Sequence, residues 1–229
     1  MEKKQVNVIN RNQVNILISI FFAVVLGLII AEFFEYTSFI YVLKPLLNPL
    51  LITIYWRSSE NRNNYFILAL LFALISNIFF ISKEFIFSLL GAIFFMSYII
   101  LIIYIVIKII KIKSYLPVIL ASIPFLTLFL YVTSLTIDEL RGVFYTYILQ
   151  IIFMSFLGGF SLSNYIIENN KMNYWLLIST VLFTIIQFIF IIKVYYISIS
   201  IFQPIVALLY SFAQFSLYKF MILSEKKIK

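Results

Sequence analysis

The residues that could do chemistry in this sequence are few, and most of them lie inside long apolar stretches. Neither cysteine nor histidine occurs among the 229 residues. This excludes a thiolate nucleophile, a histidine base and any metal site built on thiolate or imidazole ligands. One amine, Lys44, lies within an apolar stretch, where a charged group is costly and is usually functional. Lys44 is therefore a candidate catalytic residue.

Lys44 could act in either of its two protonation states. Burial favours the neutral amine, which could serve as a base, whereas the ammonium could hold a lipid phosphate. The amine could also form an ion pair with Glu32, Glu35 or Glu84, which are expected near the same end of the predicted helices. Alternatively, the long side chain could extend to the membrane surface.

Amide, hydroxyl and small side chains recur along five apolar segments at spacings of three, four and seven residues. Residues at these spacings share one face of a helix. We therefore expect each segment to turn this face into a helical bundle and its Ile, Leu and Phe side chains to lipid. Such stripes are also common where membrane helices simply contact one another, so a purely structural role stays open. The stripes are Lys44 and Asn48; Ala69, Ala73 and Ser76 with Asn77 beside them; Tyr147, Gln150 and Met154; Thr180, Thr184 and Gln187; and Gln203, Tyr210 and Gln214.

The composition places these segments in a membrane. Hydrophobic residues make up 64% of the chain and charged residues 11%, and the mean hydropathy is +1.09. A soluble domain is roughly half apolar and about a quarter charged. Because a spanning helix needs about 20 apolar residues, the sequence predicts an all-α membrane protein with eight transmembrane helices. They are predicted at residues 15–35, 39–56, 65–82, 85–107, 116–135, 143–166, 173–192 and 198–222.

Lysine and arginine predict how these helices are oriented. With the N-terminus in the cytoplasm, thirteen of the 17 basic residues fall on the cytoplasmic side, three on the other side and Lys44 within a span. The excess of basic residues in cytoplasmic loops therefore predicts a cytoplasmic tail at 1–14, a membrane domain at 15–222 and a basic cytoplasmic tail at 223–229. We expect the protein to be integral to a bacterial inner membrane.

The same placement explains the net charge of +8 without nucleic acid as a partner, since basic loops also attract anionic lipid headgroups. The sequence contains no glycine-rich phosphate loop and no carboxylate cage, so nucleotides, metals and other cofactors are not expected. The expected partners are membrane lipids or another amphiphile. LFALISNIFFI at 71–81 and LFTIIQFIFII at 182–192 are alike, which suggests a four-plus-four parallel repeat.

Six motifs resemble, in order, segments of the YhhN family of lysoplasmalogenases, and they extend over nearly the whole membrane domain. The resemblance implies eight helices, cytoplasmic termini and hydrolysis of the vinyl ether bond of lysoplasmalogen, a lysophospholipid. The motifs are LKPLLNPLLI at 43–52, LLFALISNIFFI at 70–81, FSLLGAIFFMSYII at 87–100, YILQIIFM at 147–154, VLFTIIQFIF at 181–190 and YSFAQ at 210–214.

The sequence departs from the family pattern at three positions that bear on catalysis. Asn77 and Gln187 stand where the family carries Asp, and Ile99 aligns with a family His. An amide cannot exchange a proton at useful pH, although it can hold a water or a hydroxyl. The resemblance nevertheless marks where a substrate would bind. The candidate catalytic residues are Lys44, Asn77 and Gln187, and the candidate substrate-binding residues are Asn48, Ser76, Tyr98, Gln150, Tyr210 and Gln214.

Three functions remain open on this basis, and whether the protein is an enzyme is one of the open points. The first alternative is an active or divergent lysoplasmalogenase-type hydrolase. The second is a family member that has lost the catalytic acids and binds or moves a lysolipid or other amphiphile without turnover. The third alternative is a small transporter or assembly factor with an unrelated substrate. Release of aldehyde, co-purified lipid and solute flux would distinguish them.

Overall fold

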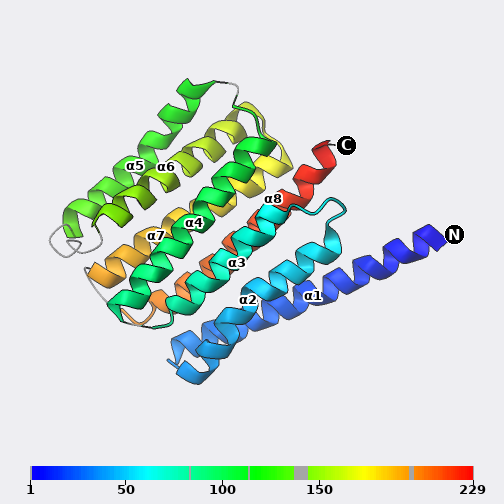
Figure 1. The fold of residues 1–229 in the computed structure, drawn as a ribbon, viewed down its shortest axis with the longest axis horizontal. Helices are drawn as coiled ribbons and strands as arrows, with labels where there is room; N and C mark the ends of the chain where they lie inside the picture. Colours follow the sequence, from blue (N-terminus) through cyan, green and yellow to red (C-terminus); the bar gives the residue numbers. More distant parts are fainter. Residues whose placement is uncertain (1, 83, 113, 137–143, 196–198, 229) are drawn as a thin grey trace.

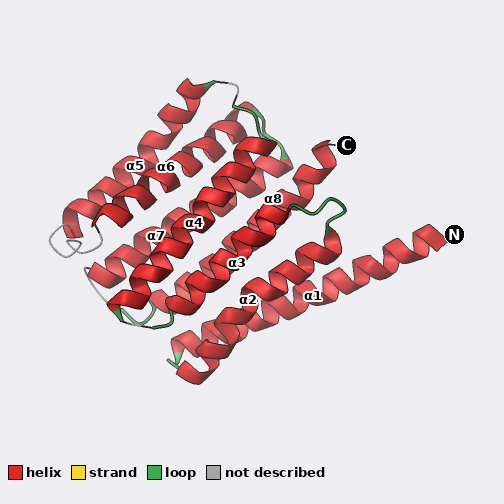
Figure 2. Ribbon diagram, viewed as in Figure 1, coloured by secondary structure: helices red, strands yellow, loops and turns green. Residues whose placement is uncertain are grey.

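The computed structural model describes residues 2–82, 84–112, 114–136, 144–195 and 199–228, with side chains described from residue 12 to 193 and from 199 to 225 within these ranges. This part of the chain folds into helices joined by short turns and loops, without a strand (Figure 1; Figure 2). The helices are α1 (Glu2–Phe33), α2 (Thr37–Ser58), α3 (Asn64–Phe79), α4 (Phe85–Ile109), α5 (Tyr115–Thr136), α6 (Phe144–Ile167), α7 (Lys171–Tyr195) and α8 (Phe202–Ile228).

The helices pack as two layers of a bundle. One layer contains α6, α4, α3 and α2, and the other contains α5, α7, α8 and α1, each helix in contact with the next in that order. Four hairpins, α1–α2, α3–α4, α5–α6 and α7–α8, supply the most extensive contacts. The N- and C-termini lie at the same end of the bundle, which we call the terminal end, and the opposite end is called the distal end (Figure 1). The hairpins are compatible with a four-plus-four repeat, which itself stays a prediction.

The expected count of eight transmembrane helices is corrected to seven candidate spans in the described part of the chain. The difference is α3, predicted as a span at 65–82 but ending at Phe79 after 16 residues. At about 1.5 Å per residue this helix is roughly 24 Å long, shorter than the roughly 30 Å hydrocarbon core. The remaining helices are long and apolar enough to cross a bilayer, and the protein is an integral membrane protein.

The polar stripes face the inside of the bundle, as predicted. Large apolar side chains such as Leu26, Ile119 and Ile152 are exposed on the outside, whereas the predicted polar residues are buried except for Lys44 and Gln203, which are half-buried. This inversion is the arrangement that lipid favours, because an unpaired polar group in hydrocarbon costs several kcal/mol. The buried members of the stripes are Asn48, Ala69, Ala73, Ser76, Asn77, Tyr147, Gln150, Met154, Thr180, Thr184, Gln187, Tyr210 and Gln214.

Small residues set how closely α5 and α6 approach. A Cβ on Gly159 of α6 would lie 2.5 Å from the backbone nitrogen of Ser122 on α5, which no real side chain could tolerate. Small residues at membrane helix contacts allow this kind of close approach. The α5–α6 hairpin is therefore fixed by the absence of a side chain at Gly159.

Candidate functional site

A cluster of amides and tyrosines lies in the middle of the bundle, and we call Asn48, Asn77, Tyr98, Tyr210 and Gln214 the central cluster. The Tyr210 hydroxyl of α8 accepts hydrogen bonds from Asn48 Nδ2 of α2 (3.2 Å) and from Gln214 Nε2 (2.9 Å). Gln214 Oε1 in turn accepts from the Tyr98 hydroxyl of α4 (3.2 Å). Three helices are thus joined through side chains that are at most 9% exposed.

The hydroxyl of Tyr210 keeps its proton available. A phenol oxygen has two lone pairs, and both face an amide N–H, from Asn48 and from Gln214. The acceptor within reach of the Tyr210 proton is Asn48 Oδ1 at 3.4 Å, which is long for a hydroxyl hydrogen bond. The geometry therefore presents Tyr210 as a donor to a molecule that enters the cluster.

Asn77 supplies a second available donor. It is 7% exposed and its side chain interacts with the Tyr210 hydroxyl, but this contact lacks the geometry of a hydrogen bond, and by that criterion Nδ2 has no partner in the described part of the chain. The neighbouring Ser76 is satisfied, because its hydroxyl donates to the backbone carbonyl of Gly91 on α4 (2.9 Å). A buried donor without a partner costs about 1–3 kcal/mol, so Asn77 is the position where a ligand oxygen would be most stabilising.

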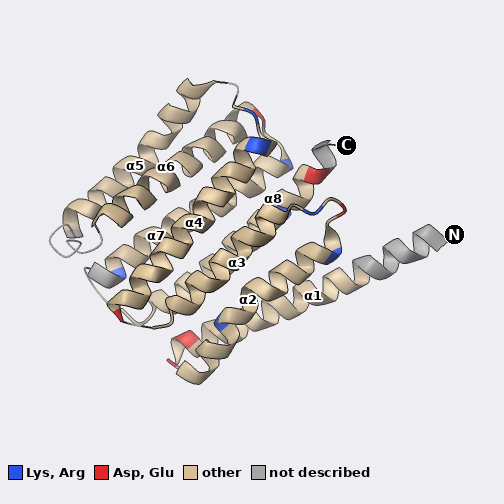
Figure 3. Ribbon diagram, in the orientation of Figure 1, with Lys and Arg blue, Asp and Glu red and all other residues tan. Residues whose placement is uncertain are grey.

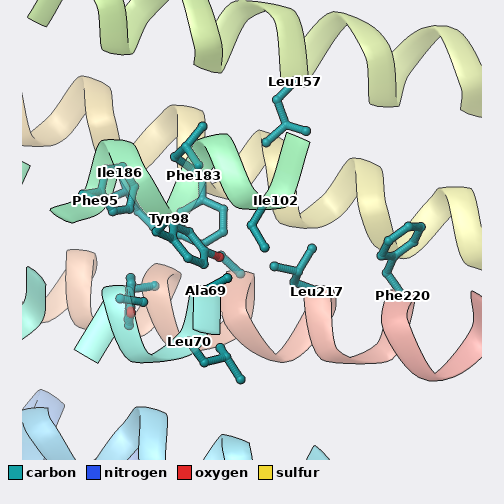
Figure 4. Packing of buried hydrophobic residues seen from close by; sticks show 14 of the residues in the cluster. Ala69, Leu70, Phe95, Tyr98, Ile102, Leu157, Phe183, Ile186, Leu217 and Phe220 are labelled. Carbon is teal, nitrogen blue, oxygen red and sulfur yellow. The ribbon is translucent and has the colours of Figure 1, made fainter. Parts of the chain in front are cut away.

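An aromatic side chain from α7 closes one side of the central cluster. Phe183 packs against Tyr98 with ring centroids 5.7 Å apart and against Tyr210 at 6.2 Å. The ring centroids of Phe95 on α4 and Phe183 are 6.0 Å apart, and Figure 4 shows Phe95, Tyr98 and Phe183 close together. Phe183 was not among the residues predicted from the sequence, although it lies four residues before Gln187 and so shares its helix face.

A separate amide pair joins α6 to α7. Gln150 Nε2 donates to Gln187 Oε1 at 3.2 Å, and both side chains are buried. Two turns along α7 from Gln187, the hydroxyls of Thr180 and Ser161 lie 2.6 Å apart. Gln150 and Gln187 therefore pair with each other, and among the described residues Gln187 makes no hydrogen bond to the central cluster.

Lys44 forms an ion pair at the distal end of the bundle. Its ammonium lies 3.3 Å from Glu32 Oε1 at the end of α1, with the two side chains 17% and 7% exposed. Glu32, Glu35 and Glu84 were predicted from the sequence as alternative partners of Lys44. The ion pair confirms Glu32, whereas Glu35 and Glu84 are exposed. Lys44 lies one helical turn from Asn48 on α2, so the pair is adjacent to the central cluster along that helix face.

A carboxylate at the terminal end was not anticipated from the sequence. Glu225 near the end of α8 accepts hydrogen bonds from the Ser59 hydroxyl (2.6 Å), the Tyr55 hydroxyl (3.3 Å) and the backbone N–H groups of Glu60 (3.1 Å) and Asn61 (3.4 Å). These contacts, which we call the Glu225 clasp, fix the α2–α3 loop to α8. Residues more than 160 positions apart give no periodic signal by which the clasp could have been found.

The structure thus separates the candidates into three places. The central cluster contains most of the predicted substrate-binding residues, Gln150 and Gln187 form their own pair, and Lys44 binds Glu32. In the described part of the chain, no group of three or more acidic side chains could hold a metal ion.

Comparison with known protein families gives a match over most of the chain. The model of the YhhN family matches residues 39–220, a range that includes the central cluster, the Gln150–Gln187 pair and Lys44 but neither Glu32 nor Glu225. No curated protein and no solved structure matches the chain.

Proposed function

Because the chain belongs to the YhhN family, we propose that it binds a lysoplasmalogen-like lysolipid in the central cluster and hydrolyses its vinyl ether bond. The observation that carries this proposal is the pair of available donors, Asn77 Nδ2 and the Tyr210 hydroxyl, side by side in a buried site. A water or ligand oxygen that accepts from Asn77 Nδ2 would relieve the cost of its unpaired amide and would lie next to the Tyr210 proton.

Vinyl ether hydrolysis requires a proton on carbon and a water. In the proposed reaction, Tyr210 delivers its proton to the alkenyl carbon that is not bonded to oxygen, and a water held by Asn77 attacks the other alkenyl carbon. The water proton returns to the Tyr210 phenolate, whose charge the Asn48 and Gln214 N–H groups stabilise. The resulting hemiacetal then breaks to release an aldehyde and the free glycerol hydroxyl of the headgroup portion.

A second candidate function, lysolipid binding without turnover, is favoured by the chemistry of the same residues. Amides occupy both positions that align with family acids, at Asn77 and Gln187. In the described part of the candidate spans the carboxylates are Glu32 and Glu225, near opposite ends of the bundle. A phenol is a weaker acid than a carboxyl group, so the site holds a ligand more readily than it protonates one.

We further propose the orientation of the protein in the membrane. Both termini lie at the terminal end (Figure 1), and most basic residues of the described part gather at that end (Figure 3). The exceptions are Lys44 in the first half of α2 and Lys193 in the last turn of α7. The tendency of cytoplasmic loops to carry Lys and Arg supports a cytoplasmic terminal end, and a bacterial inner membrane is the expected location.

The test is aldehyde release from lysoplasmalogen by detergent-purified protein. Release by the wild type that falls by about 10²-fold or more in Tyr210→Phe, a typical contribution of a proton donor, supports hydrolysis. Tyr131→Phe, which changes an exposed tyrosine of α5 in the same way, should leave the rate unchanged. Equal rates in the wild type and Tyr210→Phe would exclude Tyr210 as the donor.

Absence of turnover would separate the two candidate functions. If the wild type binds lysoplasmalogen without releasing aldehyde, and an Asn77→Asp and Gln187→Asp double variant gains release, the protein is a binding member of the family whose acids have been replaced. If the wild type binds no lysolipid, both candidate functions are wrong, and solute flux in proteoliposomes becomes the next measurement.

A further inference from the structure

Lys219 of α8 is a cation inside a candidate span, and the described part of the chain supplies no acid to pair with it. The span runs from Phe202 to Glu225, and the Lys219 side chain is half-buried. The described ion pair joins Lys44 to Glu32, whereas Glu225, the next acid along α8, is engaged in the Glu225 clasp. An ionisable group within a membrane helix is costly and commonly marks a site with a specific partner.

Aromatic rings lie where an anion would be expected beside Lys219. The ammonium is 5.1 Å from the ring centroid of Phe215 and 5.4 Å from that of Tyr218. The Tyr218 hydroxyl is already engaged, 3.0 Å from the Ser58 hydroxyl. The face of a ring attracts a cation but offers no lone pair to its N–H groups. The three N–H donors of Lys219 are therefore available to an acceptor.

An apolar surface continues from Lys219 toward the middle of the span. Phe212 and Phe215 precede Lys219 by seven and four residues, so the three side chains share one face of α8. Phe22 of α1 packs against both rings, with its centroid 5.6 Å from that of Phe212 and 5.1 Å from that of Phe215. Phe212 is 44% exposed, and the other two rings are half-buried. We call these four residues the α1–α8 surface.

Lys219 lies near the depth at which lipid headgroups begin. It is six residues before the end of the span at Glu225, which corresponds to about 9 Å along the helix axis. A lysine at this depth keeps its alkyl stem in hydrocarbon and extends its amine to the polar boundary. From the terminal end inward, the α1–α8 surface therefore presents a cation and then aromatic rings. A phospholipid presents its phosphate and its acyl chains in the same order.

We propose that the α1–α8 surface binds one anionic phospholipid, of the phosphatidylglycerol type, from the leaflet at the terminal end. The Lys219 ammonium contacts the phosphate, and the first part of an acyl chain lies along the three phenylalanine rings. In a zwitterionic phospholipid the headgroup amine competes with Lys219 for the phosphate, whereas an anionic headgroup leaves that charge to the lysine.

The bound lipid contacts both α1 and α8 and so stabilises their packing. The surface faces outward and contains no residue of the central cluster. This inference is therefore independent of the proposed hydrolysis, and the lipid at Lys219 is not consumed.

The experiment is native mass spectrometry of detergent-purified protein with phosphatidylglycerol or with phosphatidylcholine of the same chains. The wild type should bind one phosphatidylglycerol about tenfold more tightly than phosphatidylcholine, equivalent to about 1.4 kcal/mol. Lys219→Gln should remove this difference, and Lys219→Arg, which keeps the charge, should retain it. Lys171→Gln is the matched control, since Lys171 is an exposed lysine at the first residue of α7, and it should bind as the wild type does.

Equal affinity of the wild type for the two lipids would overturn the inference. An equal loss in Lys171→Gln and Lys219→Gln would also overturn it, because it would indicate general attraction to basic residues. Glycerophosphoglycerol, the soluble headgroup without chains, should not displace the lipid, and displacement would contradict a role for the rings. If Lys219→Gln does not fold, thermal unfolding of the wild type decides. Phosphatidylglycerol should raise the midpoint more than phosphatidylcholine does, and equal shifts would overturn the inference.

Discussion

Replacing Asn77 with leucine should stabilise the ligand-free protein. Asn77 Nδ2 is buried and has no partner among the described residues, and such a donor costs about 1–3 kcal/mol. Leucine has the same number and branching of side-chain heavy atoms as asparagine, and it removes this cost. It also removes the contact of Asn77 with the Tyr210 hydroxyl, and polar contacts between membrane helices average about 0.6 kcal/mol. The expected net effect is a rise of about 0.5–2 kcal/mol in the free energy of unfolding.

The matched control is the same substitution at Asn48. This residue is fully buried, and its Nδ2 donates to Tyr210 at 3.2 Å, so Asn48→Leu removes a bond that is made. It should lower the free energy of unfolding by about 0.6–1.7 kcal/mol. Both variants would be measured by reversible SDS unfolding in mixed micelles, followed by tryptophan fluorescence.

The two asparagines should therefore respond with opposite signs. Destabilisation of similar size in both variants would mean that the Asn77 amide is bonded in the folded protein, and the argument for a ligand donor at that position would fail. Stabilisation in Asn77→Leu together with loss of lysolipid binding would identify a residue retained for function at the expense of stability.

Three further predictions concern positions outside the central cluster. Glu225→Gln should speed hydrogen exchange of the two loop amides that donate to this carboxylate by about tenfold, because an amide accepts such bonds more weakly than a charged group does. Gly159→Ala should destabilise the protein by about 1–3 kcal/mol, the usual cost of overpacking, because its Cβ would collide with the Ser122 backbone. A double-mutant cycle of Gln150→Leu and Gln187→Leu should give a coupling of about 0.6 kcal/mol, with about 1.7 as the upper end.

Each of these has an outcome that would contradict it. Unchanged exchange in Glu225→Gln would mean that the α2–α3 loop is held by other contacts. Gly27→Ala, whose Cβ would lie 3.4 Å from the flexible Leu43 side chain, is the control for overpacking, and equal stability of Gly159→Ala and Gly27→Ala would refute the close approach of α5 and α6. A coupling of zero would mean that Gln150 and Gln187 are not bonded to each other.

The fold was largely predictable from the sequence because lipid imposes a simple rule on it. Apolar length located every helix, and spacings of three, four and seven residues identified the faces that are buried, as at Asn48 and Gln214. The exception, α3, was counted as a span because the apolar run continues through Phe80 and Ile81 after the helix ends at Phe79. Hydropathy measures composition and not where helical hydrogen bonding stops.

The partners within the site could not be predicted in the same way. Periodicity says that Asn48 and Tyr210 each face inward, but their bond joins residues 162 positions apart and depends on how α2 and α8 are arranged. Nearby charges were more informative, since Glu32 was among three acids expected near Lys44. Phe183 and Glu225 were missed, because a phenylalanine in an apolar run and an acid near a basic tail are both ordinary.

The contacts of α8 determine when the protein can complete its structure during synthesis. Tyr210 and Gln214 satisfy Asn48 and Tyr98, and Glu225 satisfies the α2–α3 loop, yet α8 leaves the ribosome after the other seven described helices. Until then α2 and α4 reside in the membrane with unpaired polar groups, which is costly in hydrocarbon. A chain interrupted before residue 202 would carry this defect permanently, and quality-control proteases that recognise unpaired polar groups in membrane helices could distinguish it from the finished protein.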